Sequence, residues 1–189
     1  MVRISTCQIG SRFNELSIEL THKCTLKCIY CSSDSDLNKN IFLDLLKIVE
    51  TIKNVKKEFK INTISLSGGE TFLYPKFEEL FKFLVKQELQ ILIYTSGVTI
   101  DKNNNRKSLG ENILNQLSKY KENVSVMMNI QGHNKNIIET INGVSNSYEI
   151  ITDSTNKLLE IDIPIEANVV PFKFNYEYLE KITNFCIEH

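Results

Sequence analysis

The stretch Leu16-Ser-Ile-Glu-Leu20-Thr-His-Lys-Cys24-Thr-Leu-Lys-Cys28-Ile-Tyr-Cys31 joins a strand pattern to a cluster of cysteines. Apolar and polar residues alternate over 16–20, as in a strand with one buried face. Three of the five cysteines of the chain follow at once, with gaps of three and two residues. Thiolates are soft ligands that suit iron–sulfur clusters, zinc and Cu(I). The stretch therefore predicts a metal site in the loop that leaves a strand.

The number of thiolates distinguishes between these metals. Three thiolates can bind three irons of a [4Fe–4S] cluster and leave the fourth iron open to another molecule. A structural zinc site is closed by four ligands, usually in two short-spaced pairs. The spacing favours an iron–sulfur cluster. A non-catalytic zinc-binding module, with its fourth ligand supplied from outside, remains the alternative of a different class.

Composition restricts the class of protein. The 189 residues are 42% hydrophobic and 24% charged, values typical of a globular protein, and the net charge is −1 without a large block of one sign. This gives no electrostatic reason to expect nucleic acid or a membrane as partner. Clustered cysteines without a secretion signal indicate the reducing cytoplasm. The isolated Cys7 and Cys186 are interpreted as small buried hydrophobic residues.

Strand and helix patterns alternate along the chain. We expect residues 1–14 to be an N-terminal extension, with an edge strand at Val2–Ser5, and 15–189 to be one core domain. The alternatives for this domain are a compact complete core and a core truncated at its C-terminus. Residues 101–107 read as a hydrophilic loop, and 134–146 give no clear pattern. Asn175 is expected to cap a last helix with its apolar face inward at Tyr178, Leu179, Ile182 and Phe185. Strands are expected at 16–20, 61–66, 91–94, 124–130 and 163–170, with helices between them around 45–59, 77–85, 113–120 and 147–159.

Helix-length connections between strands predict parallel pairing. The fold class is therefore α/β, and its sheet is either flat and doubly wound or curved as part of a barrel. The unusual residues all follow strand ends: the cysteines, Ser67-Gly68-Gly69-Glu70, Thr95-Ser96-Gly97, Gln131-Gly132-His133 and Asn168. Because the carboxyl ends of parallel strands meet at one edge, we expect one binding site there.

The Gly68-Gly69-Glu70 turn is the second informative motif. Two glycines allow the backbone to approach a ligand closely, and Glu70 adds a negative charge suited to an amine. Alone, the motif is an ordinary turn between a strand and a helix. The motif becomes informative because it follows the next strand after the cysteines.

Together these motifs resemble the radical S-adenosylmethionine (radical SAM) enzymes. Cys24-x3-Cys28-x2-Cys31 follows the first strand, with an aromatic residue, Tyr30, before the last cysteine, and Gly68-Gly69-Glu70 follows the second. Thr95-Ser96-Gly97 looks like the family's Thr-Asn-Gly, and Asn129-Ile-Gln131-Gly is similar to its Ser-Ile-Asp-Gly. Asn142-Gly143, with Ser147-Tyr148 after it, looks like the Arg-Gly…Ser-Phe segment of the peptide-modifying branch. The resemblance covers about residues 15–175.

The resemblance implies a set of site residues. Cys24, Cys28 and Cys31 would bind the [4Fe–4S] cluster, and Gly68, Gly69 and Glu70 would contact the amine of S-adenosylmethionine. The polar residues Ser96, Asn129 and Gln131 would lie at the rim, with Asn129 and Gln131 facing ribose or carboxylate. Adenine would lie against the backbone at Tyr30 and against Asn168 and Val170. Asn142 and Gln131 each lack the charge that the family carries there. His22 and His133 read as exposed loop residues.

The resemblance also implies a reaction. Such an enzyme is an oxidoreductase of anaerobic settings that reductively cleaves S-adenosylmethionine at the cluster, giving a 5′-deoxyadenosyl radical that abstracts hydrogen from a peptide or small-molecule substrate. A low-potential flavodoxin or ferredoxin would supply the electron. A glycyl-radical-activating enzyme is an alternative within the family. The implied fold is a partial, open parallel (β/α) barrel of about five βα units without the sixth. Its open edge is expected to be covered by a partner, a second copy or a helix.

Overall fold

Parallel strands form the centre of the computed structural model, which describes residues 2–3 and 14–188. Its main sheet has the order β1-β2-β3-β4-β7-β8, and only β1 runs antiparallel to its neighbour. The mixed α/β fold with a mainly parallel sheet is therefore confirmed. The strands are β1 (Val2–Arg3), β2 (Glu15–Glu19), β3 (Thr63–Ser67), β4 (Gln90–Thr95), β7 (Val124–Asn129) and β8 (Ile165–Asn168).

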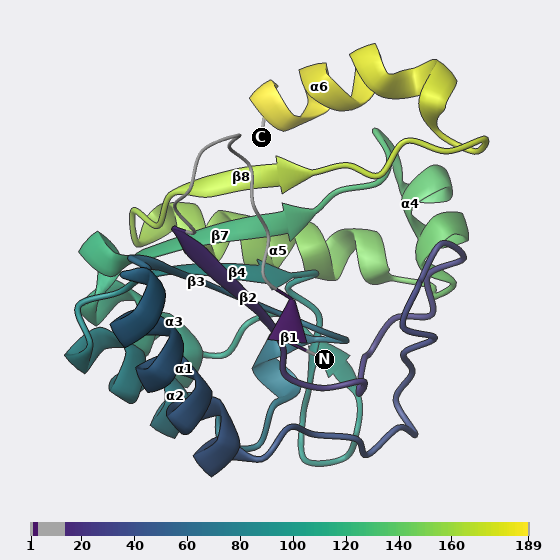
Figure 1. The fold of residues 1–189 in the computed structure, drawn as a ribbon. Helices are drawn as coiled ribbons and strands as arrows, with labels where there is room; N and C mark the ends of the chain where they lie inside the picture. The colour runs from purple at the N-terminus through teal and green to yellow at the C-terminus, as the bar shows by residue number, and fades with distance from the viewer. Residues whose placement is uncertain (1, 4–13, 189) are drawn as a thin grey trace.

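Helices connect the parallel strands, as parallel pairing requires. Figure 1 shows α1, α2 and α3 gathered on one side of the sheet and α6 beyond β8. No helix among the described residues is long and apolar enough to cross a membrane. The helices are α1 (Leu45–Phe59), α2 (Phe77–Lys86), α3 (Glu111–Lys119), α4 (Lys135–Asn142), α5 (Ser147–Glu160) and α6 (Leu179–Glu188), with 3₁₀ turns η1 (Thr71–Leu73), η2 (Lys121–Asn123) and η3 (Tyr176–Tyr178).

The core forms where the strands bury alternate side chains beneath the helices. Leu16 and Ile18 of β2 are fully buried, and β7 alternates between buried and half-buried positions. In α2 the residues Phe77, Leu80, Phe81 and Leu84, which lie on one face of the helix, are buried. The period-2 and period-3.6 patterns of the sequence therefore meet in one core.

Two segments differ from the prediction. Residues 101–107 are not only a loop, because Arg106–Lys107 (β6) pairs with Thr99–Ile100 (β5) in a short antiparallel hairpin. The unassigned segment 134–146 contains α4. Asn134 caps this helix by accepting a hydrogen bond from the backbone N–H of Ile137 at 3.0 Å.

The C-terminal helix begins later than predicted. Asn175 does not cap it: its side-chain oxygen accepts from the N–H of Phe172, and α6 starts at Leu179 after η3. Ile182 is buried as expected, but Leu179 is 38% exposed, so its predicted inward position is wrong. The predicted edge strand is seen at Val2–Arg3, whereas Ser5 and Cys7 lie outside the described residues.

Candidate functional site

The three clustered cysteines line one cavity of about 420 Å³ at the carboxyl ends of the parallel strands. Residues that follow β2, β3, β4, β7 and β8 meet there, which agrees with the expected single site at one sheet edge. Of the twelve candidate residues, Glu70 and Gln131 do not line it. The ten that do are Cys24, Cys28, Cys31, Tyr30, Gly68, Gly69, Ser96, Asn129, Asn168 and Val170.

The two glycines bring the turn after β3 against the cysteine loop. A Cβ on Gly69 would lie 2.2 Å from the carbonyl oxygen of Lys23, and one on Gly68 would lie 2.4 Å from that of Thr21. Gly68 also has φ of +131°, which other residues rarely adopt. The N–H of Gly69 donates to the Thr21 carbonyl at 2.6 Å. The glycines therefore permit a close approach of two backbones, in addition to facing the cavity.

Glu70 is fully buried behind this turn. One carboxylate oxygen accepts from the Thr95 hydroxyl at 2.5 Å, and the other accepts from the hydroxyl and N–H of Ser96 at 2.7 and 3.0 Å. The N–H of Phe72 donates to it at 3.3 Å. Burial raises the pKa of Glu70, and these hydrogen bonds oppose the rise. The carboxylate thus joins the turn after β3 to the end of β4.

Gln131 has a similar place behind the strand ends. Its amide donates to the carbonyl of Asn168 at 3.1 Å and accepts from the N–H of Val170 at 2.9 Å. The side chain of Asn168 donates to that of Asn129 at 2.8 Å. Asn175 adds a hydrogen bond to the Gln131 carbonyl. This network fixes the ends of β7 and β8, where Asn129, Asn168 and Val170 face the cavity.

Each of the three sulfurs has a polar neighbour. The N–H of Leu26 donates to Cys24 Sγ at 3.5 Å, and the N–H of Ser35 donates to Cys31 Sγ at 3.4 Å. The Cys28 thiol donates to the side-chain oxygen of Asn142 at 3.7 Å. Backbone donors of this kind suit sulfurs that become negatively charged.

Burial raises the pKa of two of these thiols. It raises the pKa of Cys24 to about 12, and nearby Glu70 adds to the rise. It raises the pKa of Cys28 to about 11, although a hydrogen bond with Tyr30 opposes this. A bound metal replaces the proton of such a thiol.

Contacts from two sides hold the cysteine loop, and the sequence pattern predicted neither contact. The end of α4 accepts backbone hydrogen bonds from Lys27 and Ile29 at 2.9 and 3.0 Å, through the carbonyls of Asn142 and Ile141. On the other side, Arg106 Nε in β6 donates to the Thr25 carbonyl at 2.7 Å. These partners lie about a hundred residues from the loop or are part of the unpredicted hairpin.

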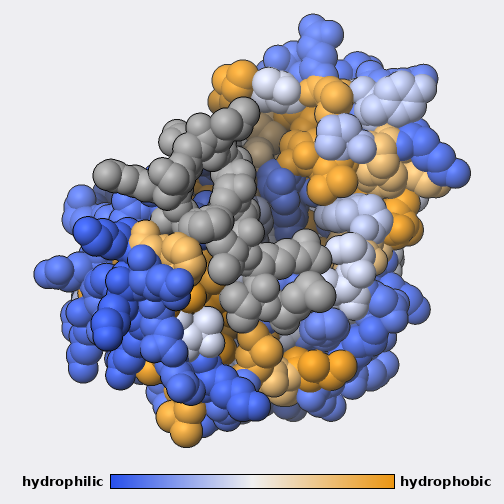
Figure 2. All heavy atoms as spheres, viewed as in Figure 1, coloured by the Kyte–Doolittle hydropathy of each residue, from blue (hydrophilic) through white to orange (hydrophobic). Residues whose placement is uncertain are grey.

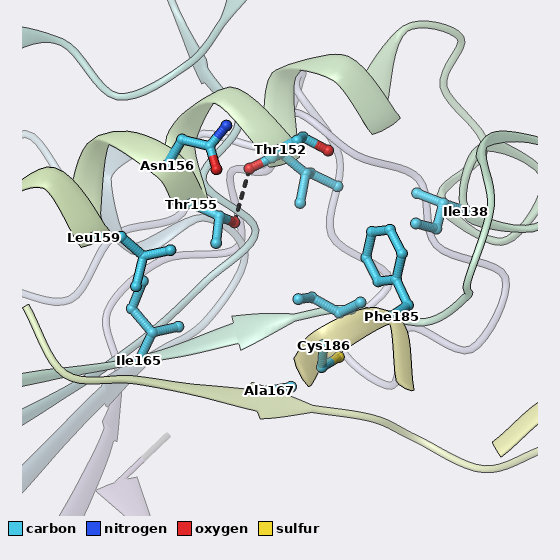
Figure 3. Close-up of a pocket in the computed structure, with 11 residues that line it drawn as sticks. Ile138, Thr152, Thr155, Asn156, Leu159, Ile165, Ala167, Phe185 and Cys186 are labelled. Carbon is cyan, nitrogen blue, oxygen red and sulfur yellow. Dashed lines mark hydrogen bonds between the residues drawn. The ribbon is translucent and has the colours of Figure 1, made fainter. Parts of the chain in front are cut away.

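The other candidate residues lie apart from this chemistry. His22 and His133 are half-buried, so the prediction that they are exposed is wrong, and neither lines the cavity. Cys186 is half-buried as well and lies in α6, at the wall of an apolar cavity of about 140 Å³. Figure 3 shows this cavity, with Phe185 and Cys186 on one side and Thr152 and Thr155 of α5 on the other.

The cavity fits a group bound through separate thiolates. A [4Fe–4S] cluster is held by one thiolate per iron, so its ligands face a common space. The hydroxyl oxygen of Ser35, which lines the cavity, is buried and has no hydrogen-bond partner among the described residues. In the part of the chain that the structure describes, no three His, Cys, Asp or Glu side chains form a site for a single metal ion.

Comparison with known families identifies the chain. Residues 18–186 match the family described as the Radical SAM superfamily, which is most of the chain. The chain belongs to the radical SAM superfamily. The members of this superfamily are enzymes that use a [4Fe–4S] cluster and S-adenosylmethionine.

Relatives of this radical SAM chain have several activities. GTP 3′,8-cyclase of Clostridium perfringens is 29% identical over 188 residues, which cover 95% of the chain and 54% of the cyclase. PqqA peptide cyclase of Granulibacter bethesdensis is 25% identical over 169 residues, covering 88% and 42%. A relative from Methanocaldococcus jannaschii, named for activation of a glycyl-radical enzyme, is 26% identical over 166 residues, covering 88% and 60%. The chain thus spans between two fifths and three fifths of these relatives.

A solved structure supports the fold. SuiB of Streptococcus suis, crystallised with its precursor peptide SuiA, has a TM-score of 0.74 and 20% identity, covering 94% of the chain and 37% of SuiB. SuiB has also been crystallised with S-adenosylmethionine. The radical SAM core described here therefore has the same arrangement of elements as part of SuiB.

Proposed function

We propose that this chain binds a [4Fe–4S] cluster through Cys24, Cys28 and Cys31 and binds S-adenosylmethionine at the iron left open. The observation that carries the proposal is the single cavity that these three cysteines share with Gly68 and Gly69. When bound, the reduced cluster would supply the one electron needed to split S-adenosylmethionine into methionine and a 5′-deoxyadenosyl radical, and this radical would take a hydrogen atom from the substrate.

The residues around the cavity would orient S-adenosylmethionine. The backbone at Gly68 and Gly69 would contact its amine, and Ser96 and Asn129 offer polar groups to its carboxylate and ribose. Tyr30, Asn168 and Val170 would hold the adenine. Glu70 and Gln131 would act from behind, because their polar atoms already hold the strand ends.

We propose a peptide as the substrate. The relative named PqqA peptide cyclase supports this class. Val170 and Phe174 are 36% and 47% exposed, and Val170 lines the cavity. Phe172 connects them to the cysteine loop, since its ring centroid lies 5.6 Å from that of Tyr30 and 5.8 Å from that of Phe174. Such apolar surface at a cavity mouth suits peptide side chains.

The distribution of hydrophobic surface agrees with a peptide that reaches the cavity from the side of β8. Figure 2 shows hydrophobic surface gathered on the side where β8, α6 and α4 lie, and mostly hydrophilic surface over α1 and α2. We propose that the five parallel strands form a partial, open (β/α) barrel, and that a partner or second copy covers the β8 edge. A cytoplasmic flavodoxin or ferredoxin would be the electron donor. Sedimentation of the protein in solution tests whether two copies associate.

Cleavage of S-adenosylmethionine tests the proposal. Anaerobically reconstituted protein, incubated with dithionite and S-adenosylmethionine, is expected to form 5′-deoxyadenosine in a reductant-dependent way. Cys28→Ala should abolish both iron uptake and this product, whereas Cys186→Ala, outside the cavity, should retain both. A colourless protein with one zinc ion per chain and no cleavage would contradict the proposal and favour the zinc-binding module.

A further inference from the structure

Asn142 is held against the Cys28 sulfur by the backbone of the cysteine loop. It is the last residue of α4 and is 2% exposed. Its carbonyl accepts from the N–H of Lys27 at 2.9 Å, and a Cβ on the next residue, Gly143, would lie 2.6 Å from the Lys27 carbonyl oxygen. The helix end therefore packs directly on the loop, and the 3.7 Å between Cys28 Sγ and the Asn142 side-chain oxygen follows from this packing.

The Cys28 sulfur differs from the other two because a side chain from another element lies against it. Cys24 and Cys31 each accept from a backbone N–H within their own loop. Cys28 has its own backbone N–H and Tyr30 as neighbours, and in addition it lies against a side-chain amide from a distant helix. A side chain can be replaced, so only at this sulfur can the helix contact be changed by mutation without altering the loop backbone.

We propose that Asn142 is a positioning residue that sets the reduction potential of the cluster through Cys28. This inference rests on the proposed function. Once Cys28 binds iron it has no proton to donate, and a half-turn of the Asn142 amide presents its N–H₂ group to the sulfur, since the two ends of an amide have nearly the same size. The amide then donates an N–H···S hydrogen bond.

The direction of the effect follows from charge. The reduced cluster carries one more negative charge than the oxidised cluster, and part of it resides on the ligand sulfurs. A hydrogen bond to a sulfur therefore stabilises the reduced form more and raises the potential, one of the means by which proteins set this quantity. Loss of the Asn142 amide is expected to lower it.

The experiment is an anaerobic redox titration of the iron-loaded protein, followed by the paramagnetic signal of the reduced cluster. Asn142→Leu removes the donor and keeps the approximate shape, and Asn142→Asp replaces it with a negative charge. Asn136→Leu makes the same chemical change at an exposed position of α4, away from the cysteines. Iron content of each sample is measured with the potential.

The expected result is a midpoint potential more negative than that of the wild type in Asn142→Leu, a larger shift in Asn142→Asp, and no shift in Asn136→Leu, at equal iron content. Unchanged potentials in both Asn142 variants would overturn the inference. So would failure of both variants to bind iron while Asn136→Leu binds it, because Asn142 would then only support the loop. A wild type that binds no iron would instead refute the proposed function on which the inference rests.

Discussion

Gly69 is the residue where the chemistry of the site and the packing of the chain meet. Its position in the sequence suggested space for a ligand, and it does line the cavity. Yet the nearest atoms to a side chain added there belong to the backbone of Lys23, one residue before Cys24. The missing side chain therefore allows the turn after β3 to position the first cysteine.

Gly69→Ala is expected to destabilise the protein. The added methyl group would lie 2.2 Å from a backbone oxygen, which cannot move as a flexible side chain could. We expect a loss of at least about 1–3 kcal/mol in the free energy of unfolding, measured by urea denaturation. Gly110→Ala is the control, because its methyl group would meet only the end of the Lys107 side chain at 3.8 Å, and it should cost less than about 1 kcal/mol. Equal stability of the two variants would contradict this account of Gly69.

Glu70→Gln is expected to weaken the connection between β3 and β4. The carboxylate accepts four hydrogen bonds, and the amide nitrogen of glutamine cannot accept one from the N–H of Ser96. We expect the free energy of unfolding to fall by about 1–3 kcal/mol. Glu79→Gln on the exposed face of α2 should change it by less than about 0.5 kcal/mol. Wild-type stability of Glu70→Gln would show that the buried network does not depend on the carboxylate.

At the scale of elements, the regular patterns were sufficient for the main strands. β2, β3, β4, β7 and β8 all lie within or next to predicted runs, because their apolar residues alternate or cluster over strand length. α4 was missed because eight residues are too few for a clear period. Its end signals were present, since Asn134 caps it and Gly143 ends it at φ of +65°.

The contacts that support the cysteine loop were beyond a reading of local pattern. Arg106 contacts the loop from a hairpin whose residues are nearly all polar, and Asn142 contacts it from a helix that the pattern did not reveal. Neither contact has a spacing rule in the sequence. The spacing of Cys24, Cys28 and Cys31 was informative because all three belong to one short loop.

The loop after β7 gives a prediction on pH. Burial lowers the pKa of His133, and nearby Lys181 adds to this. Its ring lies 5.3 Å from that of Tyr178 in η3. The unfolded chain, with an ordinary histidine pKa near about 6.5, therefore binds this proton more readily than the folded chain. The contribution of His133 is fully present above about pH 6.5 and decreases as the pH falls through the folded pKa.

Urea denaturation at pH 7.5 and 5.5 measures this contribution. We expect the wild type to lose more free energy of unfolding between the two values than His133→Gln does. Direct titration of the His133 ring by NMR should give a pKa below that of an unfolded peptide. The same loss in both proteins would show that this histidine does not contribute.

At the scale of the molecule, the sheet brings distant parts of the chain to one edge. The cavity is lined by residues from the ends of β2, β3, β4, β7 and β8, although its three cysteines lie within a span of only eight residues. Parallel pairing is the cause, because it places every carboxyl end on the same side. The fold of the radical SAM superfamily thus explains why scattered polar residues share one site with a local thiol cluster.

The most direct test of this account is the response of the reconstituted cluster to S-adenosylmethionine. The protein is loaded anaerobically, its iron is counted, and the paramagnetic spectrum of the reduced cluster is recorded with and without S-adenosylmethionine. The account predicts about four irons per chain and a spectrum that changes when S-adenosylmethionine binds at the open iron. A cluster whose spectrum does not respond, or a site that takes only zinc, would contradict it.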